Sequence, residues 1–131
     1  MLEESTDLTE IFDRLEAVLA RYVPPLMVRS GSVVGKRDYQ LWSERPVEIE
    51  GRKRKEVYFA GLMGQKGHVG FYFMPVYTHA DQRTLFAPEL LALLKGESCF
   101  HMKRLNPALE GHVEDALAQG LELYRERGWV E

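Results

Sequence analysis

The sequence contains little cysteine, no long apolar run and no strong excess of charge of one sign. One cysteine in 131 residues cannot form an internal disulfide, which excludes a small secreted scaffold built on cystines. Its apolar stretches last a few residues, whereas about 20 are needed to span a bilayer. The acidic first residues lack the basic and apolar regions of a secretory signal peptide. We therefore expect a soluble, cytoplasmic protein that does not enter a membrane.

The charge balance argues against nucleic acid as the partner. Twenty acidic and 17 basic side chains give a net charge of −3 at pH 7, whereas dedicated nucleic-acid-binding domains are usually strongly basic. The densest basic run, Arg52-Lys53-Arg54-Lys55, lacks interleaved aromatic residues. It therefore predicts the solvated tip of a hairpin, where charge discourages pairing with other strands.

The rest of the composition predicts one folded domain over residues 1–131. With 45% hydrophobic residues the chain can bury a core, and no repeat or flexible linker divides it. Apolar residues at steps of three and four predict an amphipathic helix over residues 8–22, which Pro24 stops. The same spacing predicts a second long helix that begins at Asn106-Pro107 and ends before Gly128.

Between these helices the sequence predicts mainly short strands. Alternating segments lie at residues 26–34, 39–42, 47–49, 56–63, 68–74 and 98–103. A short helix is expected over residues 89–95, ended by Gly96. Short turns favour antiparallel pairing, since parallel strands need long crossovers. The order predicts an α+β fold: an antiparallel β-sheet meander with the N- and C-terminal amphipathic helices packed on one face.

Both faces of the predicted hairpin over residues 56–74 are apolar, although the helices can cover one face only. If Phe59, Phe71 and Phe73 face the helices, the opposite face carries Tyr58, Ala60, Leu62, His68, Tyr72 and Met74. A solvated face would normally carry lysine, glutamate and threonine. We therefore expect a groove or a self-association surface, unless loops or Trp42 cover it. The residues expected to bind a ligand are Tyr58, Leu62, His68, Tyr72, Met74 and His101.

A second candidate is the thiol of Cys99. In a strand Cys99 and His101 project from the same face, and a thiol beside an imidazole can form an activated nucleophile. A free cysteine is otherwise usually an inert, buried apolar residue. The spacing of a structural zinc site is not found among His68, His79, His101 and His112. The P-loop, GxGxxG, GxSxG and HExxH signatures are also absent, so the sequence predicts no cofactor.

Three segments carry a resemblance to a known family. They are KGHVGFYF at residues 66–73, LLKGESCFHMKRL at residues 93–105 and YRERGW at residues 124–129. Together they resemble the YdhG-like domain of unknown function over most of the chain, from Ile11 to Val130. The resemblance implies an α+β domain with an antiparallel sheet and flanking helices. Some members of that family are named frataxin-like intracellular iron chaperones, which implies iron as an alternative ligand.

An iron role would belong to the acidic N-terminal helix. Frataxins are thought to use acidic surfaces, and here oxygen ligands would come from Glu3, Glu4, Asp7, Glu10 and Asp13. Acids in a first helical turn also cap the helix and complement its dipole, which is their ordinary role.

The leading hypothesis is a small cytoplasmic binding module without catalytic activity. It would hold a small molecule or a protein partner on the open sheet face. The alternatives are iron delivery through the N-terminal acids, thiol chemistry at Cys99, and a homodimer that associates through the open face.

Overall fold

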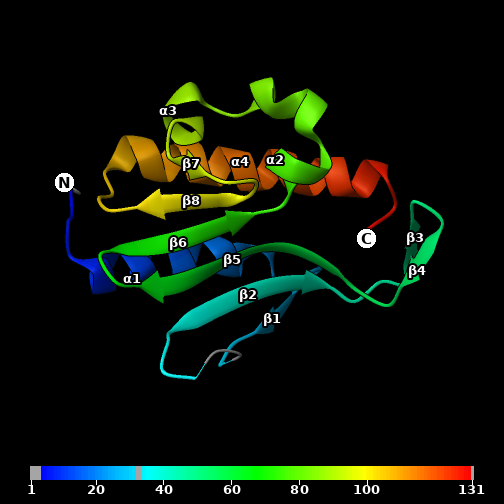
Figure 1. Ribbon diagram of the computed structural model, residues 1–131, viewed down its shortest axis with the longest axis horizontal. Coiled ribbons are helices and arrows are strands. Elements are labelled where there is room, and N and C mark those ends of the chain that lie inside the picture. Colours follow the sequence, from blue (N-terminus) through cyan, green and yellow to red (C-terminus); the bar gives the residue numbers. More distant parts are fainter. Residues whose placement is uncertain (1–3, 32–33, 131) are drawn as a thin grey trace.

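The structure is a computed structural model that describes residues 4–31 and 34–130. Its helices are α1 (Leu8–Leu19), η1 (Ala20–Tyr22), α2 (Pro75–Thr78), η2 (Ala80–Leu85), α3 (Pro88–Leu91) and α4 (Pro107–Glu126). Its strands are β1 (Met27–Arg29), β2 (Asp38–Ser43), β3 (Val47–Ile49), β4 (Arg52–Arg54), β5 (Val57–Gln65), β6 (His68–Phe73), β7 (Leu94–Lys95) and β8 (Cys99–Met102). Long helices near both ends flank a mainly β region, so the predicted α+β class is confirmed (Figure 1).

Six strands form one antiparallel sheet in the order β1-β2-β5-β6-β8-β7. Two segments depart from the predicted meander. The strands β3 and β4 form a separate hairpin between β2 and β5, which projects from one end of the molecule (Figure 1). β7 precedes β8 in the chain yet lies outside it at the sheet edge. The predicted helix over residues 89–95 is therefore too long, because α3 ends at Leu91 and Leu94 pairs with Phe100.

Helix α1 forms where its cap and apolar stripe predict it. The Asp7 carboxylate accepts hydrogen bonds from the backbone N–H groups of Thr9 and Glu10, which the first turn leaves without partners. The apolar stripe is buried and consists of Ile11, Phe12, Leu15, Val18 and Leu19.

Helix α4 also begins and ends at the predicted residues. The Asn106 side chain accepts from the Leu109 N–H at 2.8 Å, and Pro107 occupies the first turn. After the helix, Gly128 takes a φ of +75°, a left-handed conformation that favours glycine. The chain then turns back, so that Trp129 is 5% exposed against the body of the protein.

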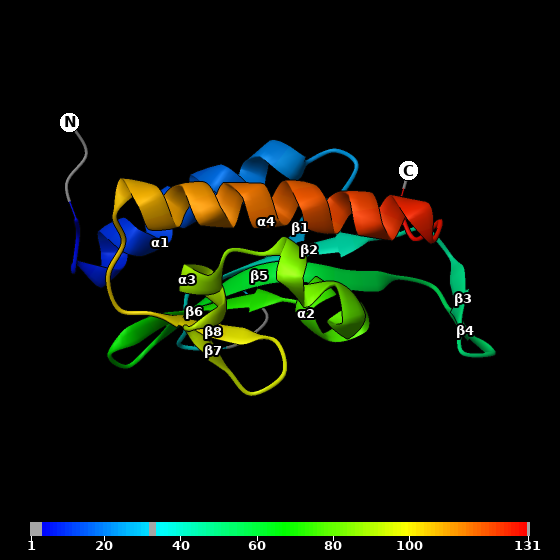
Figure 2. The same ribbon diagram turned by 90° about the horizontal axis from the view of Figure 1, so that it is seen from above.

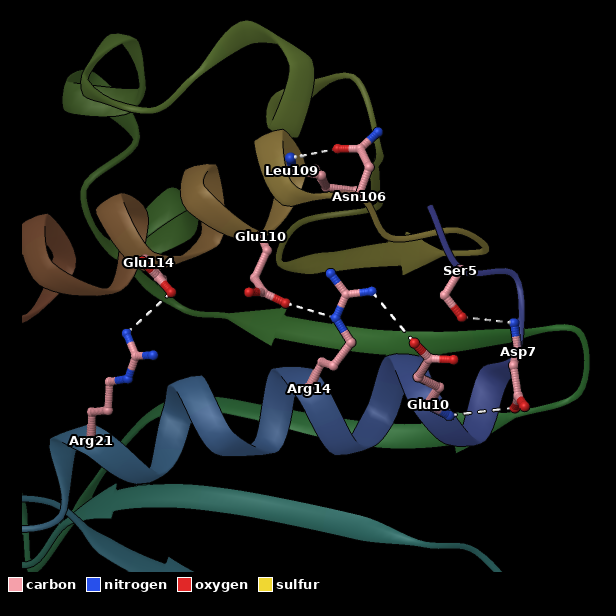
Figure 3. A network of polar contacts seen from close by, with 9 residues as sticks. All are labelled: Ser5, Asp7, Glu10, Arg14, Arg21, Asn106, Leu109, Glu110 and Glu114. Atoms are coloured by element: carbon pink, nitrogen blue, oxygen red, sulfur yellow. Dashed lines mark hydrogen bonds and ion pairs between the residues drawn. The ribbon is translucent and has the colours of Figure 1, made fainter. Parts of the chain in front are cut away.

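The two long helices run in the same direction over one face of the sheet (Figure 2). Ion pairs join them: Arg14 Nε lies 3.0 Å from Glu110 Oε1, and Arg21 Nη1 lies 3.1 Å from Glu114 Oε1 (Figure 3). The core between helices and sheet is rich in rings, namely Phe12, Phe59, Phe71, Phe73, Phe100 and Tyr124. Within the described residues, no helix lies across the opposite face (Figure 2).

Strand β5 contains one extra residue relative to β2. Trp42 pairs with Tyr58 and Leu41 pairs with Ala60, so Phe59 has no partner of its own in β2. Such a β-bulge interrupts the ladder and shifts the alternation of faces by one position. Phe59 and Ala60 are successive residues, yet both are fully buried, in agreement with this geometry.

Because of the bulge, Leu62 lies on the opposite face of the sheet from the one that the sequence predicts. Leu62 pairs directly with Phe71, and direct partners face the same side of an antiparallel sheet. Leu62 therefore lies under the helices with an exposure of 0%, and Ala60 lies there beside Phe73. The predictions that place Leu62 and Ala60 on the opposite face, with Leu62 as a ligand-binding residue, are wrong.

Candidate functional site

The sheet face turned away from α1 and α4, here called the open face, carries polar and aromatic side chains. Four direct cross-strand pairs define it: Trp42 with Tyr58, Gln40 with Gly61, Gly70 with His101, and Tyr72 with Cys99. Met63 and His68 share this side because they stand two positions from Gly61 and Gly70. Tyr58 and Tyr72 are half-buried here, on the face that their alternation predicts.

A cavity of about 600 Å³ lies on the open face, and we call it the sheet cavity. Its lining comes from β1, β2, β5 and β6 and consists of Arg29, Gln40, Trp42, Tyr58, Met63 and Tyr72. Small-molecule sites in proteins have volumes of roughly 300–1,000 Å³. The sheet cavity is therefore large enough for a small ligand.

A row of hydrogen bonds holds the floor of the sheet cavity. The Tyr58 hydroxyl donates to Gln40 Oε1, and Gln40 Nε2 donates to Asp38 Oδ2 at 3.4 Å. Asp38 Oδ1 in turn accepts from the Gly31 amide at 2.6 Å. Burial raises the pKa of Tyr58, which keeps its hydroxyl a neutral donor. Because Asp38 and Gln40 are 6% and 9% exposed, the row is fixed in place.

Two glycines let these side chains lie flat on the sheet. A Cβ atom at Gly61 would lie 1.9 Å from Gln40 Oε1 and 2.3 Å from Tyr58 Oη. On the neighbouring strand, a Cβ atom at Gly70 would lie 3.3 Å from Cε2 of Tyr72. The space that side chains at positions 61 and 70 would fill is thus occupied by the tyrosines that line the cavity.

Arg29 closes one side of the rim. Its Nη2 donates to Glu44 Oε2 at 3.0 Å and also to Glu56 Oε2. The guanidinium lies over the Trp42 ring, 4.9 Å from the ring centroid. The hydrogen bond from Arg29 lowers the pKa of Glu56, which stays ionised at neutral pH. Two carboxylates and a ring therefore already engage this arginine.

A larger cavity, of about 900 Å³, lies between the β3–β4 hairpin and the end of α4, and we call it the hairpin cavity. Its lining includes the rings of Trp42, Tyr58, Tyr124 and Trp129. Met74, which the alternation predicts on the open face, instead follows β6 as the N-cap of α2 and lines this second cavity. Trp42 and Tyr58, with ring centroids 5.0 Å apart, line both cavities, so the cavities adjoin.

Cys99 and His101 share the open face but have different neighbours. Tyr72 is the cross-strand partner of Cys99 and shares a hydrogen bond with its thiol. Burial raises the pKa of that thiol, which disfavours the nucleophilic thiolate. His101 stacks on His68, with ring centroids 3.9 Å apart. Cys99 and His101 thus project from one face as the sequence predicts, and their neighbours are Tyr72 for Cys99 and His68 for His101.

The acids of the N-terminal helix have separate structural roles. Asp7 caps α1. Glu10 Oε1 lies 3.8 Å from Arg14 Nη1, and Asp13 Oδ1 lies 2.6 Å from Arg37 Nη2. Glu3 lies outside the described residues. Within residues 4–31 and 34–130, no three His, Cys, Asp or Glu side chains form a group that could hold a metal ion.

Sequence reasoning missed four residues of the sheet cavity: Arg29, Gln40, Trp42 and Met63. For Gln40 and Trp42 a signal existed, since Asp38, Gln40 and Trp42 recur at every second position of β2 and therefore share one face. For Met63 no signal existed, because the bulge at Phe59 reverses the face that simple alternation predicts.

Comparison of the chain with protein-family models, curated proteins and solved structures finds no match. The resemblance to the YdhG-like domain therefore stays a prediction. In the part of the chain that the structure describes, the helices are too short or too polar to cross a membrane.

Proposed function

We propose that the chain is a binding module that holds a small, mainly apolar ligand in the sheet cavity and does not catalyse a reaction. The supporting observation is a preformed cavity of about 600 Å³ on a sheet face that α1 and α4 leave uncovered. The side chains of Trp42, Met63 and Tyr72 offer ring and thioether surface to such a ligand. Aromatic rings give large contact areas, and methionine adapts to irregular shapes.

One polar group on the ligand would suit the floor of the cavity. The Gln40 amide and the Tyr58 hydroxyl are held in position by their mutual hydrogen bond. A few fixed polar groups among apolar walls are typical of small-molecule sites, where they set the orientation of the ligand. Arg29 is engaged by Glu44 and Glu56, so the proposal requires no charge on the ligand.

The surroundings of the other candidate groups favour binding over the alternatives. The raised pKa of Cys99 argues against thiol chemistry. Asp7 serves as a helix cap, and Glu10 and Asp13 face arginines, which argues against an iron site on α1. A second copy of the chain on the open face is an outcome that the experiment below can detect.

Titration with N-phenyl-1-naphthylamine, a neutral fluorescent aromatic probe, tests this function. We expect saturable binding, weakened about tenfold or more by Tyr72→Ala, because that ring lines the cavity. Tyr77→Ala is the matched control, since Tyr77 is 51% exposed and lines the hairpin cavity instead. Equal affinities of the two variants, or no binding to the unchanged protein, would refute the proposal.

Indole NMR signals can locate the probe, because the chain contains two tryptophans. Trp42 lines both cavities, whereas Trp129 lines the hairpin cavity. A probe in the sheet cavity should shift the indole N–H signal of Trp42 and leave that of Trp129 unchanged. A shift confined to Trp129 would contradict the proposed site. Sedimentation equilibrium on the same samples shows whether the chain forms a dimer, and a dimer that Tyr72→Ala abolishes would place a second copy on the open face and also contradict the proposal.

A further inference from the structure

We propose that the hairpin cavity is a second binding site, specific for an aromatic organic anion. Two arginines from different elements line it: Arg54 lies in β4, and Arg127 lies at the C-terminal end of α4. Among the ion pairs of the described residues, none involves Arg54 or Arg127. Two guanidinium groups thus line an aromatic cavity, and neither forms an ion pair with a described carboxylate.

The aromatic part of this cavity is rigid. The Trp129 ring lies 4.9 Å from the Tyr124 ring and 5.6 Å from the buried His79 ring, measured between centroids. The Trp129 carbonyl accepts from Ser43 Oγ at 2.6 Å, and the Tyr124 hydroxyl donates to the Tyr58 carbonyl at 2.7 Å. Rings held in this way can pack against a planar ligand without a further loss of side-chain freedom.

Two of the three acids in the lining have a cationic neighbour outside it. Glu56 is bound by Arg29. Glu48 stands directly opposite Lys53 in the β3–β4 hairpin. The remaining acid, Glu50, stands in the tight turn of that hairpin with a φ of +52°. With Glu48 and Glu56 beside basic residues, Glu50 is the one carboxylate of the described lining that opposes the two arginines, which leaves an excess of positive charge in a chain whose net charge is −3.

The local structure orients both arginines toward the cavity. Arg54 pairs with Val47, and Val47 packs against the core, so Arg54 stands on the side of the hairpin that faces the body. The guanidinium of Arg127 lies over the Trp129 ring, with its Cζ 5.2 Å from the ring centroid. A guanidinium offers paired N–H donors to carboxylate, sulfonate or phosphate oxygens. We therefore assign to this cavity a ligand with a ring for the aromatic surface and an anionic group for the arginines.

The test uses two probes that differ in one anionic group. 8-Anilinonaphthalene-1-sulfonate carries a sulfonate, and N-phenyl-1-naphthylamine is its neutral counterpart. We expect Arg54→Gln/Arg127→Gln to weaken binding of the sulfonate about tenfold or more, because two charge-assisted contacts are lost. Binding of the neutral probe, whose proposed site is the sheet cavity, should not change.

The matched control is Arg52→Gln/Lys55→Gln, which removes the same charge from the same region at residues that lie outside the lining and do not pair with its acids. An equal loss of sulfonate binding in this control would show a long-range charge effect and overturn the proposal. Thermal unfolding of both double variants verifies that the fold is kept. The sulfonate should also shift the indole N–H signal of Trp129, and an unchanged signal would overturn the proposed position.

Benzoate and phenyl phosphate, used as competitors of the sulfonate, distinguish the two natural classes of anion. Displacement by one of them identifies the class, and displacement by neither overturns the proposal. The outcome is independent of the sheet cavity, because neither Arg54 nor Arg127 lines that cavity. Loss of sulfonate binding can therefore occur while neutral-probe binding persists, and the reverse result is equally observable.

Discussion

At Gly61 the space of a side chain is taken by the Tyr58–Gln40 hydrogen bond, so an added methyl group must displace one of these partners. We expect Gly61→Ala to lower the free energy of unfolding by about 1–3 kcal/mol, the usual cost of overpacking. Gly64→Ala in the same strand is the control, since its Cβ atom would meet its nearest atom at an ordinary 3.6 Å. Urea denaturation measures both variants, and equal stabilities would show that the floor of the sheet cavity adapts without cost.

The stacked imidazoles of His68 and His101 predict a shifted titration. Burial, followed by the neighbouring His101 and Lys103, lowers the pKa of His68 below its ordinary value of 6.5. We expect His101→Gln to raise the pKa of His68, because the substitution removes the neighbouring imidazole that lowers it. Titration of the imidazole NMR signals measures this pKa. An unchanged value would mean that the stacked pair does not form in solution.

Helix α4 approaches the sheet closely at Gly120. A Cβ atom there would lie 2.7 Å from Cζ of Phe73 and 2.9 Å from Cγ of Pro75, whereas nothing lies within 4 Å of one at Gly111. Alanine is favoured over glycine in a helix by roughly 0.5–1 kcal/mol. We expect Gly111→Ala to gain that amount, and Gly120→Ala to lose stability because the buried ring of Phe73 cannot move freely. Thermal unfolding of the two variants checks this, and stabilisation by both would contradict the close packing of α4.

The two long helices could be predicted from the sequence because their signals are local. Asp7 and Asn106 cap backbone groups within three residues of themselves, so the sequence next to each cap contains the information. The face of a strand is less local, since one extra residue reverses it. The ring of the bulged Phe59 packs against two rings of other elements. Its centroid lies 5.9 Å from that of Phe73 in β6 and 5.1 Å from that of Tyr124 in α4. Nothing near β5 in the sequence marks this arrangement.

The candidate sites could be predicted in part for the same reason. His68 and Tyr72 lie in β6, which has a regular register with β5, and their predicted face is correct. The sheet cavity also requires the pairing of Trp42 with Tyr58, which long-range contacts determine. The hairpin cavity depends further on the return of Trp129 to β2. Alternation therefore predicts one uncovered face, whereas both cavities arise from contacts between elements.

Considered as a whole, the molecule separates its stabilising side from its candidate binding side. The fully buried rings lie between the sheet and the helices α1 and α4, whereas the open face has half-buried rings and a fixed polar row. Substitutions of exposed atoms on the open face should therefore change binding more than folding. This separation makes Tyr72→Ala a usable test of function.

The buried imidazole of His79 makes the free energy of unfolding depend on pH in the mildly acidic range. His79 is 2% exposed, and its Nδ1 lies 2.8 Å from Thr78 Oγ1. Its Nε2 is buried and has no hydrogen-bond partner among the described residues. Burial first, and Arg127 second, lower the pKa of His79, while Asp81 and Glu126 act in the opposite direction. Folding therefore favours the neutral imidazole.

Because the pKa is lowered in the folded state, the unfolded chain takes up the proton at the higher pH. The stability that neutral His79 contributes is thus complete above its ordinary pKa of 6.5 and is lost as the pH falls from 6.5 toward the lowered value. Glu56, whose pKa is lowered from 4.5, acts in the same direction at more acidic pH. Urea denaturation between pH 6.5 and 4.5 should show a falling free energy of unfolding in the unchanged protein and a shallower slope in His79→Gln. Equal slopes would assign the acid sensitivity to a group other than His79, because every other histidine is common to both proteins.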